Sequence, residues 1–268
     1  MSEQMSTAVV IRAQLRRLRG AAGLNQEEYG RRAHYSPSLI SAVELGQATP
    51  TLAYLKRADE VLGTGGLFVA LRALGRRERE PIWFRPWLEA EREAAQLRCF
   101  GAMMVPGLLQ TADYARAVFR LDTALTPDRV EEMVAARLDR QSILGGDDPA
   151  HLTAVIDETA LRRFSEGAAE MMVGQLRHLV DCARRPHIRV HLLPVGLGLH
   201  AGLFGPFILG WSADGDWTGF LDNQIGGTVV DEVEGMATLL RRWESVRSDA
   251  LSRQQSIDLI EEILKPWT

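Results

Sequence analysis

The sequence predicts a mainly α protein with two domains: a small all-α domain over residues 1–77 and a larger α+β domain over residues 82–268. In the first part, short apolar segments at helical spacing alternate with glycine and capping residues. A charged stretch, residues 75–82 (GRREREPI), then forms a linker or a linker helix. From His151 onward, short β-branched runs alternate with helical segments, which indicates a small sheet.

Composition places the chain among ordinary globular proteins, with 46% hydrophobic and 25% charged residues. No apolar run is long enough to cross a bilayer, and the N-terminus lacks the pattern of a signal peptide. Cys99 and Cys182 stand far apart and outside any CxxC pattern, so we expect reduced thiols. We therefore expect a cytoplasmic protein without a membrane partner.

Charge is distributed unevenly along the chain, although the net charge is only −4. Residues 1–77 carry eleven basic and six acidic side chains, a net of +5, and the remainder carries a net of −9. A basic end on an acidic chain is expected when one end meets nucleic-acid phosphate and the other does not.

Five short helices are expected in the first domain. Asn25 is a good N-cap for the second helix and Ser36 for the third, in which Pro37 takes the first helical position. Gly23 and Gly46 end the first and third helices. The predicted helices span residues 8–22, 26–33, 37–44, about 50–62 and 67–74.

The third helix has two distinct faces. Ile40 and Val43 form an apolar inner face, and the outer face carries small residues: Pro37, Ser38, Ser41 and Ala42. A small outer face allows a helix to lie deep in a DNA major groove, which is about 12 Å wide. A plain helical bundle with a small-residue packing face fits the same periodicity.

The segment GLNQEEYGRRAHYSPSLISAVELGQATPTLAYLKRADEVLG resembles the Xre-type helix-turn-helix of phage repressors over about 65 residues. The match includes GLNQ before the second helix, S-x-S-x-I-S-x-x-E-x-G in the third, and P-T-L before the fourth. The resemblance implies that double-stranded DNA is the partner. The residues that it places at the DNA are Asn25, Gln26, Ser36, Pro37, Ser38, Ser41 and Ala42.

These positions differ in role. Asn25 and Gln26 would contact phosphate at the start of the second helix, and the third helix would face the bases. The chain lacks Gln, Asn or Arg at the base-reading positions, so we expect thymine-methyl contacts from Leu39 or Ala42, together with DNA shape, to contribute to recognition. Arg19 and Glu44 match a pair that forms a buried ion pair in this fold; two exposed charges are the alternative.

The larger domain is expected to begin with helices and to continue as a small sheet with helices. Ser252 and Gln255 fit a capping box before the last helix. The expected helices span residues 83–97, 108–120, 127–144, 168–184, 231–246 and 252–264. The expected strands span residues 152–157, 187–194, 204–211 and 217–222.

This region also resembles the long domain that follows Xre-type helices in WhiJ-like regulators of actinobacteria, over residues 82–265. Characteristic segments are VPGLLQTADYARAVF, DETALRR and HLLPVGLGLHAGLFGPFILG. The resemblance implies an antitoxin-like arrangement with a small BldB-like partner protein. It implies no settled chemistry for the domain.

Candidate chemistry in the larger domain is sparse. His187, His191 and His200 have no zinc-ligand spacing, so no metal is expected. The segment VGLGLHAGLFGPF lacks the ending of a phosphate-binding loop, so no cofactor is expected, and a mobile hairpin loop is the favoured interpretation.

Two other groups allow more than one interpretation. Asp157 and Glu158 fit either a catalytic pair at a strand end or, preferably, an ordinary helix start. The aromatic residues fit either a core or an aromatic-lined pocket: Trp83, Phe84, Trp87, Tyr114 and Phe119. Because no nucleophile-and-base set can be assembled, we expect no enzyme.

The sequence thus predicts a DNA-binding transcriptional regulator that forms a homodimer. The larger domain would dimerise and receive a protein or small-molecule signal. The predicted receiving surface comprises Pro106 to Arg116, with Gln110 and Tyr114, and the loop Val195 to Gly205, with His200 and Gly202. A DNA-tethered enzyme domain of unknown reaction is the alternative.

Overall fold

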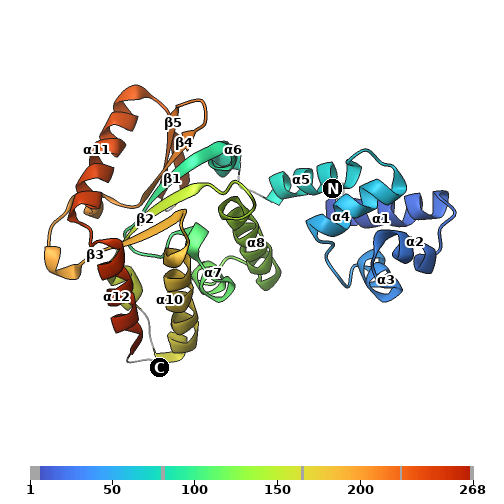
Figure 1. Ribbon diagram of the computed structural model, residues 1–268, viewed down its shortest axis with the longest axis horizontal. Helices are drawn as coiled ribbons and strands as arrows, with labels where there is room; N and C mark the ends of the chain where they lie inside the picture. Colours follow the sequence, from blue (N-terminus) through green and yellow to red (C-terminus); the bar gives the residue numbers. More distant parts are fainter. Residues whose placement is uncertain (1–6, 80–81, 164–165, 224, 266–268) are drawn as a thin grey trace. The chain divides into compact units, whose positions relative to one another are not determined.

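A computed structural model describes residues 7–79, 82–163, 166–223 and 225–265 (Figure 1). Contacts divide the chain into two compact units, Met1–Glu80 and Pro81–Thr268, hereafter unit 1 and unit 2. Unit 1 is all-α, and unit 2 is an α+β unit with a six-stranded mixed sheet, as the sequence predicted in outline. In the part of the chain that the structure describes, no helix is both long and apolar enough to cross a membrane.

Unit 1 contains five helices within the described residues. Their starts are set locally: the side chains of Asn25, Ser36 and Thr51 each accept a hydrogen bond from a backbone N–H in the first turn of α2, α3 and α4. The helices are α1 (Thr7–Ala21), α2 (Gln26–Ala33), α3 (Pro37–Leu45), α4 (Leu52–Leu62) and α5 (Leu67–Arg79).

The core of unit 1 is formed by the inner faces of all five helices, with Tyr29, Ile40, Leu55 and Phe68 among its most buried side chains. Leu52 lies outside this core and is 41% exposed, because it is the first residue of α4, next to the cap.

Helix α5 is longer than predicted, since it continues from residue 74 to Arg79 through most of the predicted linker. Its start is held by Asp59 of α4, whose carboxylate accepts hydrogen bonds from the backbone N–H groups of Phe68 (2.9 Å) and Val69 (3.1 Å). Thr64 also donates its hydroxyl to Asp59. The end of the predicted linker, at residues 80–81, lies outside the described residues.

Unit 2 contains strands, α-helices and short 3₁₀ turns that lie between them. The strands are β1 (Ala94–Gly101), β2 (His151–Asp157), β3 (Ile188–Leu193), β4 (Phe207–Ser212), β5 (Trp217–Asn223) and β6 (Gly226–Val230). The α-helices are α6 (Arg85–Glu93), α7 (Ala112–Phe119), α8 (Pro127–Arg140), α9 (Glu158–Arg162), α10 (Ala169–Arg184), α11 (Val233–Asp249) and α12 (Arg253–Leu264). The 3₁₀ turns are η1 (Ile82–Phe84), η2 (Gly107–Leu109), η3 (Gln141–Leu144), η4 (Glu166–Ala168), η5 (Val195–Leu197) and η6 (Ala201–Phe204).

The sheet has the order β3-β2-β1-β4-β5-β6. Strands β1, β2 and β3 are parallel, and β4, β5 and β6 continue the sheet in antiparallel fashion. Helices α10 and α12 pack on one face, where Leu152, Ile156 and Leu192 form the larger core. Helix α11 packs on the other face, against Phe100 and Leu209. Figure 1 shows α11 on the opposite side of the sheet from α10.

Two strands were missed in the sequence. Residues 94–97 were predicted as the end of a helix, yet they begin β1, which pairs with both β2 and β4. Ala94 and Gln96 favour helix, but hydrogen bonding on both sides of the strand outweighs this local preference. Strand β6 was not predicted because its five residues begin with two glycines. The first region of unit 2 is therefore not purely helical.

Candidate nucleic-acid interface

The turn between α2 and α3 depends on a residue without a side chain. A Cβ atom on Gly30 would lie 2.6 Å from the carbonyl oxygen of Tyr35 and 3.1 Å from Ile40 Cδ1. Residue His34 closes α2 in the left-handed conformation (φ 62°), and α3 begins three residues later. Gly30 thus allows the two helices to approach as closely as a helix-turn-helix requires.

The predicted pair of Arg19 and Glu44 lies side by side in unit 1. Arg19 Nε donates to Glu44 Oε1 (2.6 Å) and Nη2 donates to Oε2 (2.9 Å), which is a two-point contact between α1 and α3. The Arg19 side chain is 14% exposed and that of Glu44 is 6% exposed. Arg19 Nη1 also donates to the carbonyl oxygen of Leu24, just before α2.

Gln26 completes this network, because its side-chain Nε2 donates to Glu44 Oε2 (3.0 Å). Burial acts to raise the pKa of Glu44, but hydrogen bonds from Arg19 and Gln26 outweigh burial and lower it. Glu44 is therefore an anion that joins α1, α2 and α3 in one arrangement. The predicted phosphate contact of Gln26 starts from a side chain that is already oriented by this carboxylate.

The exposed face of α3 carries no charge. Pro37 and Ser38 are exposed, whereas Ser41 and Ala42 are only half-buried on the flank of the helix. The Ser38 hydroxyl lies 3.0 Å from that of Ser36, which also caps the helix. Ser38 can therefore still offer hydrogen-bonding capacity to an outside partner.

Helix α3 also exposes two leucines, one of them beside the predicted base-reading positions. Leu39 is 37% exposed and Leu45 is 64% exposed. The sequence predicts a thymine-methyl contact for Leu39 or Ala42 and no role for Leu45, which lies at the end of the helix. Its apolar character at an exposed position was the signal that could have marked it.

The start of α2 is less open to an anion than the resemblance implied. The Asn25 side chain accepts from the backbone N–H of Glu28 (2.8 Å) and so caps its own helix. Glu27 and Glu28 place negative charge in the first turn, although Glu28 is paired with Arg32. A phosphate at this point would be bound mainly through the side-chain amides and not through a free helix end.

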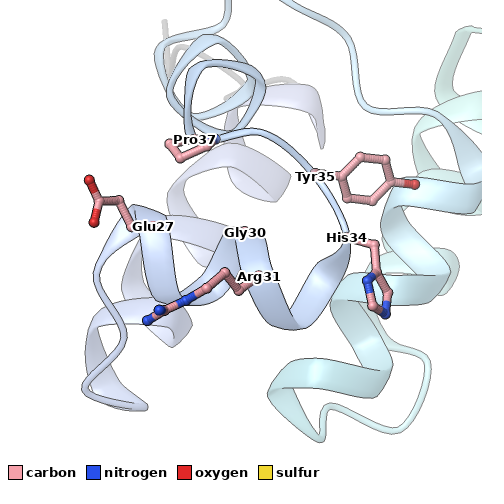
Figure 2. Close-up of a pocket in the computed structure, with 6 residues that line it drawn as sticks. All are labelled: Glu27, Gly30, Arg31, His34, Tyr35 and Pro37. Atoms are coloured by element: carbon pink, nitrogen blue, oxygen red, sulfur yellow. The ribbon is translucent and has the colours of Figure 1, made fainter.

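A hollow of about 480 Å³ lies beside the turn between α2 and α3. Figure 2 shows its lining, which brings Arg31 of α2 and Pro37 of α3 to the same concave surface. The complete lining is Glu27, Gly30, Arg31, His34, Tyr35 and Pro37. The hollow adjoins the start of α3, so it belongs to the same candidate interface.

In unit 2, two of the predicted signal-receiving residues are used by internal hydrogen bonds. Gln110 is 2% exposed; its Nε2 donates to the carbonyl oxygen of Val105 (2.7 Å), and its Oε1 accepts from Arg137 (2.8 Å). The Tyr114 hydroxyl accepts from the Val105 backbone N–H (3.3 Å). Both side chains hold the connection after β1 in place.

The other two predicted receiving residues anchor the glycine-rich loop. The Gly202 N–H donates to His200 Nδ1 (3.2 Å), so the ring proton lies on Nε2, 3.3 Å from Asp157 Oδ2. A Cβ atom on Gly202 would lie 2.2 Å from the Phe100 ring. The loop, predicted as a mobile hairpin, contains the turns η5 and η6 and is docked at these two residues.

The exposed side chains of this loop are different ones. Leu199 is 91% exposed, Phe204 is 77% exposed and Leu203 is 61% exposed. The loop follows β3 and carries the chain to β4, and its anchors Asp157 and Phe100 lie at the ends of β2 and β1. The loop therefore covers the carboxyl edge of the parallel strands, where open α/β sheets generally bind ligands.

The remaining candidate groups have structural partners. Asp157 caps α9 by accepting from the Thr159 N–H (2.8 Å), and Glu158 accepts from Arg162 and from the Val195 N–H (2.9 Å). His187 contacts the carbonyl oxygen of Leu144, and His191 contacts that of Leu251. Across the described ranges, no group of three or more His, Cys, Asp or Glu side chains is arranged to hold a metal ion.

The aromatic residues do not form one cluster. Trp83, Phe84 and Trp87 gather around Phe220 of β5, with Trp87 fully buried and Trp83 43% exposed. Tyr114 belongs to the main core, whereas Phe119 packs in a small separate cluster between α7 and α8.

Comparison with known families agrees with this division. A family model described as a helix-turn-helix domain matches residues 11–73, and one described as a domain of unknown function (DUF5753) matches residues 84–262. The second match covers more than half of the chain. No curated protein and no solved structure matches the chain.

Proposed function

Since the chain belongs to the DUF5753 family and carries a helix-turn-helix domain ahead of that region, we propose that it is a sequence-specific, DNA-binding transcription regulator. The observation that carries the proposal is the Glu44 network, which holds α3 against α1 and α2 and leaves the small, uncharged face of α3 exposed. Helix α3 is the element that would enter the major groove.

On this proposal, contacts to phosphate position the protein on DNA and contacts to the bases read the sequence. Gln26 binds phosphate, and the exposed face of α3 contacts base edges through Ser38 and thymine methyls through Leu39. Because the face of α3 offers few donors and acceptors, DNA shape supplies part of the specificity.

Unit 2 supplies dimerisation and signal reception on this proposal. One short reading helix gives too few contacts to select a site among genomic competitors, and a dimer on a palindromic or paired site doubles them. The resemblance to WhiJ-like regulators favours an antitoxin-like arrangement in which the signal is a small BldB-like protein; a small molecule is the alternative. The exposed leucines and Phe204 of the loop Val195–Gly205 support reception there.

A DNA-tethered enzyme is the competing proposal, and the pair of Asp157 and His200 is its best starting point. A general base needs a free ring nitrogen, but His200 Nδ1 accepts from Gly202 and Nε2 faces Asp157. We therefore assign the pair to holding the loop and propose no reaction for unit 2.

The proposal is tested by selecting duplexes from a random pool with the full chain and then measuring affinities by fluorescence anisotropy. A recurrent sequence should be enriched. Gln26→Ala should weaken binding to all duplexes similarly, and Ala42→Gln should change the preferred sequence. Gln254→Ala, an exposed glutamine of α12 in unit 2, is the matched control. Failure to enrich any sequence would contradict the proposal.

A further inference from the structure

Unit 1 contains two kinds of cationic side chain. Several arginines are held by internal partners, as Arg17 is by Gln14 and Arg32 is by Glu28. Others donate no hydrogen bond and form no ion pair anywhere in the described part of the chain; these are Arg12, Arg16, Arg31 and Lys56. An unpaired guanidinium has five N–H donors available for an outside anion.

Two of the unpaired arginines lie at the C-terminal end of α3. A Cβ atom on Gly46, the residue that ends α3, would lie 1.6 Å from Arg12 Nη1, so this guanidinium lies directly over Gly46. Arg16 follows one turn later on α1 and is close enough to act on the Glu44 carboxylate. The segment from Gly46 to Thr51, which follows α3, contains no charged residue of its own.

The third unpaired arginine lies at the other end of α3. Arg31 of α2 shares the hollow of Figure 2 with Pro37, the first residue of α3. Glu27 lies one turn earlier on α2, but no ion pair joins it to Arg31 within the described residues. Lys56, the unpaired cation on α4, belongs to a helix that packs mainly against α1, α2 and α5.

We infer that Arg12 and Arg16 at one end of α3, and Arg31 at the other, bind DNA phosphates on the two sides of the groove that α3 enters. Helix α3 has nine residues and is therefore about 13 Å long, close to the width of a major groove, about 12 Å. Arginine matches phosphate by two parallel N–H donors. The inference rests on the proposed function and adds phosphate-binding residues to it.

If Arg12 only stabilised α3, the measurable effect of its removal would be different. A cation at a helix C-terminus stabilises the helix by interaction with its dipole. That effect would appear in the stability of unit 1 and not in the salt dependence of DNA binding. Each phosphate contact, by contrast, contributes about 0.9 to the slope of log affinity against log salt concentration.

The test measures this slope for the full chain by fluorescence anisotropy, on the enriched duplex and on a mixed-sequence duplex of equal length. The variants are Arg12→Gln/Arg16→Gln, Arg31→Gln and, as the matched unpaired cation, Lys56→Gln. We expect the slope to become shallower by about 1.8 for the double variant and by about 0.9 for Arg31→Gln. Lys56→Gln should leave the slope unchanged. Arg12→Lys keeps the positive charge, so its slope should stay close to that of the parent chain.

The outcomes separate this inference from the proposed function. Slopes equal to that of the parent chain, or an equal change in Lys56→Gln, would overturn the inference and leave the regulator proposal intact. The expected arginine dependence on mixed-sequence DNA without any enriched sequence would support the phosphate contacts and overturn the sequence-specific function. Circular dichroism melts identify a variant that fails to fold, and Arg31→Gln, remote from Gly46, then decides.

Discussion

Glu44 joins three helices through one carboxylate, since it accepts from Arg19 twice and from Gln26 once. Glu44→Ala would leave the largely buried guanidinium of Arg19 without its anion. We expect the free energy of unfolding of unit 1 to fall by about 3 kcal/mol, as for other broken buried pairs. Urea unfolding of the full chain measures this.

Glu28→Ala is the control for that change, because it breaks the exposed pair of Glu28 with Arg32, whose side chains are 37% and 56% exposed. It should cost less than about 1 kcal/mol. Equal losses in the two variants would show that burial of the Glu44 pair has no special effect.

The same carboxylate makes unit 1 sensitive to acid. Burial opposes ionisation of Glu44, but the hydrogen bonds from Arg19 and Gln26 hold its pKa below the usual value of 4.5. The folded state therefore binds a proton less readily than the unfolded state. This contribution to stability is complete above pH 4.5 and is lost as the pH falls through the lowered pKa.

Urea unfolding between pH 3 and 7 checks this prediction, with Glu44→Gln as the comparison. The variant should show a weaker loss of stability in acid than the parent chain. Identical pH profiles would mean that other carboxylates account for the whole loss.

Gly30 is a further residue whose replacement we expect to disturb unit 1, because the fold leaves no space for a side chain there. Gly30→Val places a branched side chain against the Tyr35 carbonyl oxygen and Ile40, where even a Cβ is too close. We expect a loss of roughly 1–3 kcal/mol in the free energy of unfolding and weaker DNA binding. Gly20→Ala, in α1 with nothing within 4 Å, should instead be neutral or stabilising by up to about 1 kcal/mol.

Among the elements, those with local signals were predicted well and those decided by distant pairing were not. Asn25, Ser36 and Ser252 mark helix starts because a cap is a contact within one turn, and the capping box at Ser252 is present as predicted. Strand β1 was mistaken for helix because its identity depends on β2 and β4, more than 50 residues away. At the candidate interface, the Glu44 pair followed from a resemblance, whereas the unpaired state of Arg12 and Arg31 depends on which side chains the fold brings together.

Helix α12 closes the outer side of β3, which is an edge strand of the sheet. The Ser256 hydroxyl accepts from the Leu192 N–H (2.9 Å) and donates to the Ser252 carbonyl oxygen (2.8 Å). Ser256→Ala leaves the buried N–H of Leu192 without an acceptor, so we expect a loss of about 1–3 kcal/mol. Ser248→Ala, on the exposed side of α11, should change stability by less than about 0.5 kcal/mol.

Calorimetric melting of unit 2 in the full chain measures both serine variants. A melt of Ser256→Ala that coincides with that of Ser248→Ala would indicate that α12 contributes to the edge through apolar packing alone.

At the scale of the whole molecule, the two units carry opposite net charge, and unit 2 should not contact DNA. On the proposed function, unit 2 supplies dimerisation. We expect residues 1–80 alone, which have their own core, to be folded, monomeric and weak on DNA, and the full chain to be dimeric. Light scattering at micromolar concentration, combined with anisotropy, checks this. A monomeric full chain that binds its enriched duplex tightly would contradict it.

The loop between β3 and β4 alternates residues that face the sheet with residues that face solvent. His200 and Gly202 are fixed by Asp157 and Phe100. Leu199 and Leu203 are largely exposed, and the Phe204 ring lies 4.6 Å from the guanidinium of Arg242. We expect substitutions of His200 and Gly202 to lower the stability of unit 2, and substitutions of Leu199 and Leu203 to change it little. On the proposed function, exchange of Leu199 and Leu203 therefore alters the choice of partner while the base of the loop keeps its place.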